Sequence, residues 1–130
     1  YLVNHKIWRV MIKVLYVEDD LMTGRIFDHL FSGFTDTELT IFTSGYEAIA
    51  HLQDYKYDLI ILDLGLNDIS GLEIADILRN DMNLSTPIIL TSAHIESDME
   101  SPLVTQIVEK PLTSDHIQEL LSTYTEFSVN

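Results

Sequence analysis

The chain has no cysteine among its 130 residues, which excludes disulfide bonds and thiolate metal sites. A reducing compartment is then the default, and we expect a cytoplasmic protein. Apolar residues make up 46% of the chain, but no uninterrupted run approaches the roughly 18 residues of a membrane span, so we expect no membrane insertion. Five glycines and three prolines are too few for a fibrous or low-complexity chain. Length and composition together indicate one globular domain.

Positive charge is also scarce. Seven Lys and Arg residues stand against 21 Asp and Glu residues, a formal net charge of −14. Nucleic acids and anionic membranes are bound by clustered basic side chains, so we expect neither as a direct partner. A basic protein or a divalent cation fits this charge better. Much of it is ordinary solvated surface, and position in the fold must show which carboxylates matter.

The first ten residues precede Met11, which looks like a natural start. They lack the apolar stretch and the cleavage site of a signal peptide. We therefore assign residues 1–11 to an extension, natural or left from cloning, residues 12–126 to the folded domain, and residues 127–130 to a tail.

Short apolar runs alternate with amphipathic stretches from Lys13 onward. This alternation is typical of βα repeats and predicts an α/β fold, a three-layer sandwich around a parallel sheet. The predicted strands cover residues 13–17, 39–42, 57–63, 88–93 and 105–109. Between the last two strands only about 11 residues remain for two loops and a helix, and Pro102 interrupts them, so we expect at most one or two helical turns there.

Polar residues follow the apolar runs at the strand ends. Right-handed crossovers bring the carboxyl ends of parallel strands to one edge of the sheet. The residues expected at this edge are Glu18, Asp19, Asp20, Asp63, Thr91, Ser92 and Lys110. Carboxylates this close repel one another and either take up a proton or bind a cation. Mg²⁺ suits them because it keeps several waters and accepts phosphate oxygen, and the Lys110 ammonium would attract the same anion. The edge is therefore predicted to hold a metal ion and a phosphoryl group together.

Four segments at these strand ends form a more specific pattern than any one of them. They read VLYVEDD, LIILDLGLNDISG, PIILTSA and VEKP, in this order. Over residues 12–124 the chain resembles the receiver domains of two-component response regulators, of the chemotaxis-regulator type. The resemblance implies a doubly wound, flavodoxin-like sheet of five parallel strands in the order 2-1-3-4-5, here with a shortened or irregular fourth helix.

The resemblance also implies a metal site and a phosphoacceptor. Asp63 falls at the position that takes a phosphoryl group from a histidine kinase or a histidine phosphotransfer protein. Asp19 and Asp63 would bind Mg²⁺ directly, Glu18 would hold it through water, and the backbone carbonyl of Gly65 would add a ligand. No cofactor besides Mg²⁺ is implied.

The remaining roles concern the phosphoryl group and the partners. Ser92 would hydrogen-bond a phosphoryl oxygen after reorienting, Lys110 would pair with it, and Pro111 would follow a cis bond. Such a domain is not an enzyme beyond catalysing its own phosphorylation and dephosphorylation. Its partners would include an output domain or effector protein, and a homodimer is compatible with the resemblance.

Three features depart from the family pattern. Asn67 stands where a proline is common, which we expect to loosen the loop. Ile107 stands where Tyr or Phe is common, and the segment expected to form the fourth helix is short. The last two favour an alternative, a pseudo-receiver that acts as a constitutive interaction module without a phosphorylation switch.

Several residues keep a second interpretation. Asp20 could cap the first helix rather than bind metal. Thr91 would replace Ser92 if the strand register differs by one residue, and Lys110 could be a solvated loop residue. Two enzyme classes fit poorly. A flavin-binding flavodoxin would need a phosphate-cradling loop where the acidic EDD segment stands, and a dehalogenase-type hydrolase would need an aspartate where Gly65 stands.

Overall fold

The computed structural model describes residues 2–3, 6–7, 11–96 and 100–127. Its main sheet has five parallel strands: β3 (Ile12–Val17), β4 (Thr37–Phe42), β5 (Leu59–Asp63), β6 (Ile88–Ser92) and β7 (Gln106–Glu109). Their order across the sheet is β4-β3-β5-β6-β7. When the five strands are numbered 1 to 5 along the chain from β3, this order is 2-1-3-4-5, which confirms the prediction. Two short strands before the domain, β1 (Leu2–Val3) and β2 (Lys6–Ile7), pair antiparallel with each other.

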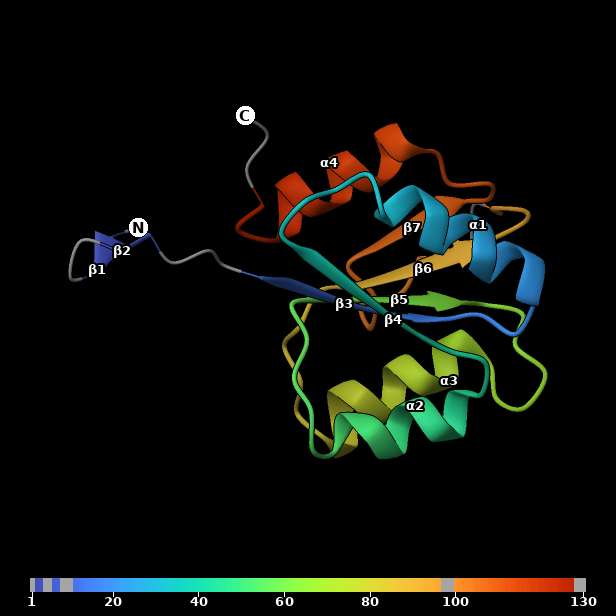
Figure 1. Ribbon diagram of the computed structural model, residues 1–130. Helices are drawn as coiled ribbons and strands as arrows, with labels where there is room; N and C mark the ends of the chain where they lie inside the picture. The colour runs from blue at the N-terminus through green and yellow to red at the C-terminus, as the bar shows by residue number, and fades with distance from the viewer. Residues whose placement is uncertain (1, 4–5, 8–10, 97–99, 128–130) are drawn as a thin grey trace.

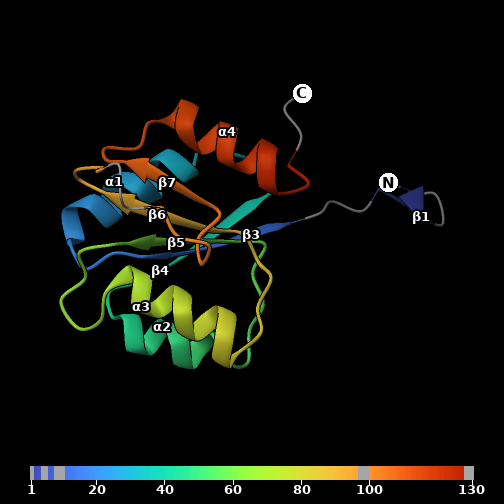
Figure 2. The same cartoon turned by 180° about the vertical axis from the view of Figure 1, so that it is seen from behind.

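Helices cover both faces of this sheet. One face carries α1 (Leu21–Phe31) and α4 (Ser114–Tyr124), and the other carries α2 (Gly45–Leu52) and α3 (Gly71–Asp76), as the two opposite views show (Figures 1 and 2). A π-helical turn, η1 (Ile77–Asp81), continues α3. The doubly wound three-layer architecture is therefore confirmed.

The central strand β5 explains the continuous apolar run in the sequence. All five of its residues are buried. Leu59 and Ile61 belong to the core beneath α1 and α4, while Ile60 and Leu62 belong to the core beneath α2 and α3. Successive side chains of a strand point to opposite faces, so a strand covered on both sides needs an apolar residue at every position. The run ends at Asp63, where the strand reaches the edge of the sheet.

The connection between β6 and β7 departs from the regular βα pattern. Its described residues, 93–96 and 100–105, contain no helix. Arg79, in η1, ties this connection to the segment before β6: its Nε donates to the carbonyl of Leu103 over 3.0 Å, and its Nη1 donates to the carbonyls of Leu84 and Thr86, which precede β6, over 2.8 and 2.7 Å. One guanidinium thus links the connection after β6 to the segment that precedes β6.

Among the described residues, no helix has the length and apolar character needed to cross a bilayer.

Candidate metal and phosphoryl site

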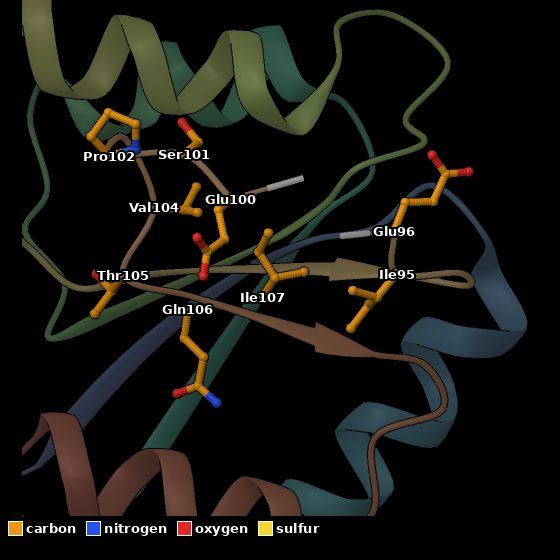
Figure 3. A pocket seen from close by; sticks show the side chains of 9 residues that line it. All are labelled: Ile95, Glu96, Glu100, Ser101, Pro102, Val104, Thr105, Gln106 and Ile107. Atoms are coloured by element: carbon orange, nitrogen blue, oxygen red, sulfur yellow. The ribbon is translucent and has the colours of Figure 1, made fainter. Parts of the chain in front are cut away.

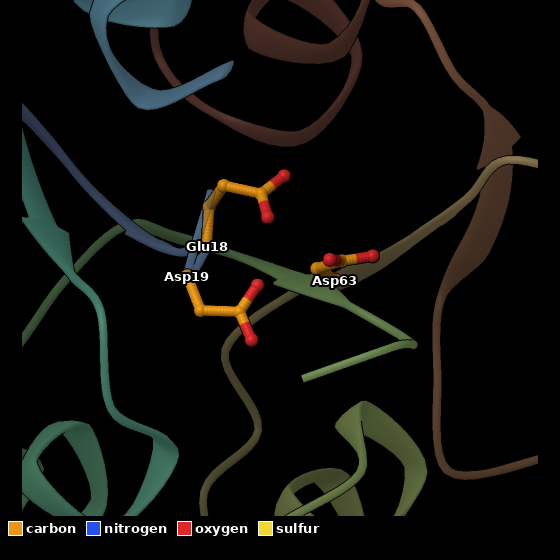
Figure 4. A group of neighbouring side chains, drawn as sticks. All are labelled: Glu18, Asp19 and Asp63. Atoms are coloured by element: carbon orange, nitrogen blue, oxygen red, sulfur yellow. The ribbon is translucent and has the colours of Figure 1, made fainter. Parts of the chain in front are cut away.

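Three carboxylates meet at the carboxyl edge of the sheet. Glu18 and Asp19 follow β3, and Asp63 ends the adjacent strand β5, which pairs with β3 up to the Val17–Leu62 register. One oxygen from each carboxylate lies within 4.8 Å of the other two, and Figure 4 shows the three side chains gathered around one space. Glu18 is 1% exposed and Asp63 is 7% exposed. Like charges held this close and away from water call for a cation among them.

Lys110 supplies one positive charge to this cluster. Its Nζ lies 2.6 Å from Oε1 of Glu18 and 3.4 Å from Oδ2 of Asp63. Burial by itself lowers the pKa of Lys110, but the hydrogen bond to Glu18 and the negative charge of Asp63 outweigh it, so the pKa of Lys110 is raised. The ammonium therefore keeps its charge at neutral pH. Lys110 is part of the site rather than a solvated loop residue, and the bond to Pro111 is cis, as predicted.

Tyr16 belongs to the site although the sequence analysis did not single it out. Its ring is fully buried against Phe27, and its hydroxyl donates to Oε1 of Glu18 over 3.0 Å. Burial, followed by the adjacent Glu18 charge, raises the pKa of the Tyr16 phenol. Two signals could have revealed this role: residues two apart on a strand share a face, and a buried tyrosine hydroxyl needs a partner.

Ser92 and Thr91 lie at the end of β6, beside β5. The hydroxyl of Ser92 donates to the carbonyl of His94 over 2.8 Å, a hydrogen bond within the loop that follows β6. Thr91 is fully buried, and its hydroxyl donates to the carbonyl of Leu62 over 3.4 Å. A hydrogen bond from Ser92 to a phosphoryl oxygen stays a prediction.

The loop after Asp63 is tied down on both sides. The N–H of Asn67 donates to Oδ2 of Asp19 over 2.8 Å. The Asp68 carboxylate accepts from the Ser44 hydroxyl over 2.8 Å and from the N–H groups of Gly45 and Tyr46 over 3.2 and 3.1 Å. These contacts correct the expectation that Asn67 loosens the loop, because its N–H, which a proline would lack, makes a hydrogen bond.

Gly65 and Asp20 take different places around the cluster. The exposed Gly65 lies two residues after Asp63 and donates its N–H to Oδ1 of that residue over 3.3 Å. A metal-binding role for its carbonyl stays a prediction. Asp20 caps α1 by accepting the N–H of Thr23 over 3.0 Å, and the hydrogen bonds from Thr23 lower the pKa of Asp20. Between the two interpretations of Asp20, the structure favours the helix cap.

A second hollow lies beside β7, away from the carboxylates. It has a volume of about 710 Å³ and borders the described residues of the connection between β6 and β7 (Figure 3). Apolar side chains of Ile95, Val104 and Ile107 line it together with the acidic Glu96 and Glu100. It contains no residue of the carboxylate cluster.

The donor set fits Mg²⁺. The three carboxylates offer hard oxygen ligands that lie close together; Glu18 and Asp63 are buried and Asp19 is half-buried. Mg²⁺ typically binds a few protein carboxylates of this kind. The ammonium of Lys110, 3.4 Å from Asp63, would pair with an anionic oxygen bound near this cluster.

Comparison with known proteins agrees with this geometry. The family described as the response regulator receiver domain matches residues 14–122. The transcription factor SKN7 of Saccharomyces cerevisiae is 30% identical over 85% of this chain, although the chain spans only 18% of that protein. The signal receiver domain of a LuxO repressor protein from Vibrio parahaemolyticus is 26% identical, with a TM-score of 0.80 over 88% of this chain and 90% of that one.

A further solved structure is the response regulator protein TrrA from Thermotoga maritima in complex with Mg²⁺-BeF. It is 28% identical, with a TM-score of 0.74 over 88% of this chain and 99% of that one. The family match covers most of the chain, and the acidic cluster lies where the matched strands end. This chain therefore belongs to the response regulator receiver domain family of two-component signalling proteins.

Proposed function

We propose that this domain accepts a phosphoryl group on Asp63 from a phosphohistidine of a kinase or phosphotransfer protein, and that phosphorylation changes its interactions with partners. The observation that carries the proposal is the convergence of three carboxylates and Lys110 on one point of the sheet edge. This point brings together a nucleophilic carboxylate, oxygens that suit a metal ion and an ammonium, which are the groups that phosphoryl transfer to an aspartate requires.

The chemical step is a transfer between two side chains. A carboxylate oxygen of Asp63 attacks phosphorus, the P–N bond to the donor imidazole breaks, and its electron pair stays on that nitrogen. Glu18, Asp19 and Asp63 would hold Mg²⁺, which supplies charge neutralisation for the transferring oxygens. Lys110 would stabilise a phosphoryl oxygen from the other side, because its Nζ already lies 3.4 Å from Asp63. The domain itself turns over no other substrate.

Asp63 needs little reorganisation for this role. Its backbone is fixed in the central strand, and its side chain is 10% exposed, so one oxygen can be reached from the crevice. A protein assists phosphoryl transfer to a weak nucleophile mainly by holding that nucleophile in a fixed and accessible position. The complex of TrrA with Mg²⁺-BeF supports the same arrangement here.

The donor protein must touch the rim of this crevice, and α1 begins at that rim. Three large apolar side chains of α1 are exposed: Leu21, Met22 and Ile26 are 68%, 62% and 54% accessible. Apolar side chains on a surface helix are candidates for a protein contact rather than for solvent. We propose that the phosphodonor docks over the first two turns of α1, which would present its histidine to Asp63.

Incubation with Mg²⁺ and a small-molecule phosphodonor tests the proposal. We expect the intact protein to gain the mass of one phosphoryl group, with loss of the gain in Asp63→Asn and a strongly reduced rate in Lys110→Met. Asp81→Asn, an exposed aspartate outside the crevice, serves as the matched control and should be phosphorylated like the parent. A gain that persists in Asp63→Asn, or no gain in the parent protein, would refute the proposal.

A constitutive interaction module is the second candidate. Two observations favour it. In β7, Ile107 stands where the family commonly has Tyr or Phe, and the described part of the preceding connection lacks a helix. NMR spectra with and without beryllofluoride separate the two functions. Shift changes confined to the carboxylate cluster would support the module, whereas changes that extend to β7 and the hollow beside it would support a switch.

A further inference from the structure

The hydrogen bond between Asn67 and Asp19 joins two segments that lie 48 residues apart in the sequence. Asp19 follows the strand β3, and Asn67 lies in the loop after the phosphoacceptor. The N–H of Asn67 is bound to Oδ2 of Asp19 over 2.8 Å, a strong hydrogen bond to a carboxylate by its length. A carboxylate with one oxygen engaged in this way can rotate little, so its other oxygen keeps a defined direction.

The loop that carries the N–H of Asn67 is itself held in place. The next residue, Asp68, accepts three hydrogen bonds from the N-terminal segment of α2, which come from Ser44, Gly45 and Tyr46. Its carboxylate also accepts its neighbour's N–H, from Ile69, over 3.0 Å. Asn67 therefore lies between an anchor on α2 and a carboxylate of the site, and its backbone cannot shift without breaking one of the two.

We propose that the backbone N–H of Asn67 is a positioning group for the metal site, which orients Asp19 so that its free oxygen faces the cluster with Glu18 and Asp63. This inference rests on the proposed function only in taking that cluster as the Mg²⁺ site. Partners that hold the second atom of a metal ligand typically change metal affinity by about 10-fold to 100-fold when they are removed. Asp68 contributes by holding the loop that carries this N–H.

A backbone donor can be removed by proline, which has no N–H. We expect Asn67→Pro to weaken Mg²⁺ binding to the unphosphorylated protein by roughly tenfold, measured by calorimetry or by titration of amide resonances. Asn67→Ala keeps the N–H and is the control at the same position, so its affinity should stay within about twofold of the parent, well short of that tenfold loss. Unchanged or tighter binding by a folded Asn67→Pro would overturn the proposal.

Proline could also prevent this loop from folding, so a second variant leaves Asn67 intact. Asp68→Ala removes the anchor on α2, and we expect weaker Mg²⁺ binding together with loss of hydrogen-exchange protection at the Asn67 amide. Full protection and unchanged affinity in Asp68→Ala would contradict the anchoring role.

Phosphorylation at saturating Mg²⁺ separates this inference from the proposed function. If the parent protein is phosphorylated on Asp63 while Asn67→Pro binds Mg²⁺ as the parent does, the positioning role is wrong and the proposed function stands. If Asn67→Pro loses Mg²⁺ affinity as expected while the parent binds Mg²⁺ but is never phosphorylated on Asp63, the proposed function is wrong and the positioning role stands.

Discussion

Tyr16 donates its hydroxyl to Oε1 of Glu18 over 3.0 Å at a place where neither side chain is reached by solvent. The same oxygen accepts from Lys110 over 2.6 Å. A buried carboxylate is costly unless hydrogen bonds replace its hydration. The phenol and the ammonium together make an acidic residue tolerable at the end of a core strand.

Replacing Tyr16 by Phe tests the contribution of the phenol. We expect Tyr16→Phe to lower the free energy of unfolding by about 1–3 kcal/mol, because Glu18 stays buried and loses a donor. Urea denaturation followed by circular dichroism measures the change. Tyr46→Phe is the matched control, since the Tyr46 side chain is exposed, and should change stability by less than about 0.5 kcal/mol. Equal effects of the two substitutions would show that the Tyr16–Glu18 bond contributes nothing.

Gly71 packs directly on the end of β5, beside Asp63. A Cβ at this position would lie 2.6 Å from the carbonyl oxygen of Asp63 and 2.7 Å from Leu90, and the first of these atoms belongs to the backbone. We expect Gly71→Ala to cost about 1–3 kcal/mol and to slow phosphorylation, because Asp63 must move.

Gly24→Ala provides the control for Gly71→Ala. Its Cβ would meet Ile41 at 3.9 Å, an ordinary contact, and alanine favours the helix, so stability should be unchanged or raised by up to about 1 kcal/mol. Chemical denaturation gives both stabilities, and phosphorylation rates follow from mass spectrometry. A Gly71→Ala protein as stable and as reactive as the parent would rule out close packing as a constraint on Asp63.

Arg79 is expected to stabilise the connection between β6 and β7. Removal of its guanidinium in Arg79→Met leaves the carbonyls of Leu103, Leu84 and Thr86 without this donor, so we expect a loss of about 2 kcal/mol and faster amide exchange around residues 103–106. Arg25→Met, an exposed arginine of α1, is the control for the change in charge and volume. If both variants unfold at the same denaturant concentration, the three hydrogen bonds of Arg79, one to the connection and two to the segment before β6, do not contribute to stability.

Asp68 gives the protein a specific dependence on acid. Partial burial raises the pKa of Asp68, but the hydrogen bonds from Tyr46, Ser44 and Gly45 outweigh it, so the pKa of Asp68 is lowered. A carboxyl group with a lowered pKa in the folded state stabilises the protein above its unfolded pKa of about 3.9, and this contribution is lost as the pH falls through the folded value.

The pH dependence is measured by comparing Asp68→Asn with the parent. Because Asp68→Asn removes a negative charge and one acceptor oxygen at the N-terminus of α2, we expect a difference of about 1 kcal/mol at pH 7, which shrinks well below pH 3.9 as the parent carboxylate is protonated. Denaturation curves at both pH values give the two differences. A stability difference that does not vary between them would mean that the charge of Asp68 plays no part.

Most of the fold could be predicted from local sequence patterns. The run from Leu59 to Leu62 is apolar at every position, and only a strand covered on both faces requires that. The cap of α2 is a local feature as well, since the hydroxyl of Ser44 accepts the N–H of Glu47, three residues later, over 3.2 Å. Such features depend on residues close together in the chain, which is why the sequence shows them.

The candidate site was only partly predictable for the opposite reason. Strand order and direction bring Glu18, Asp19, Asp63 and Lys110 to one edge, so their convergence follows from the βα pattern. The hydrogen bond from the phenol of Tyr16 to Glu18 was not predicted, and the hydroxyl of Ser92 donates to His94. Nothing in the residue type of Asn67 reveals a backbone hydrogen bond, because every residue except proline carries the same N–H.

The amino-acid sequence by itself determined the βα alternation, the buried central strand and the set of charged residues at its end. These follow from hydrophobic periodicity and from the chain direction that parallel strands share. Only the tertiary structure decided which oxygen meets which donor: Tyr16 and Lys110 on Glu18, Asn67 on Asp19, Asp68 on α2 and Arg79 on the connection before β7. Hydrogen bonds need atoms within about 3 Å of one another, and for residues tens of positions apart that distance is fixed only when the whole fold has packed.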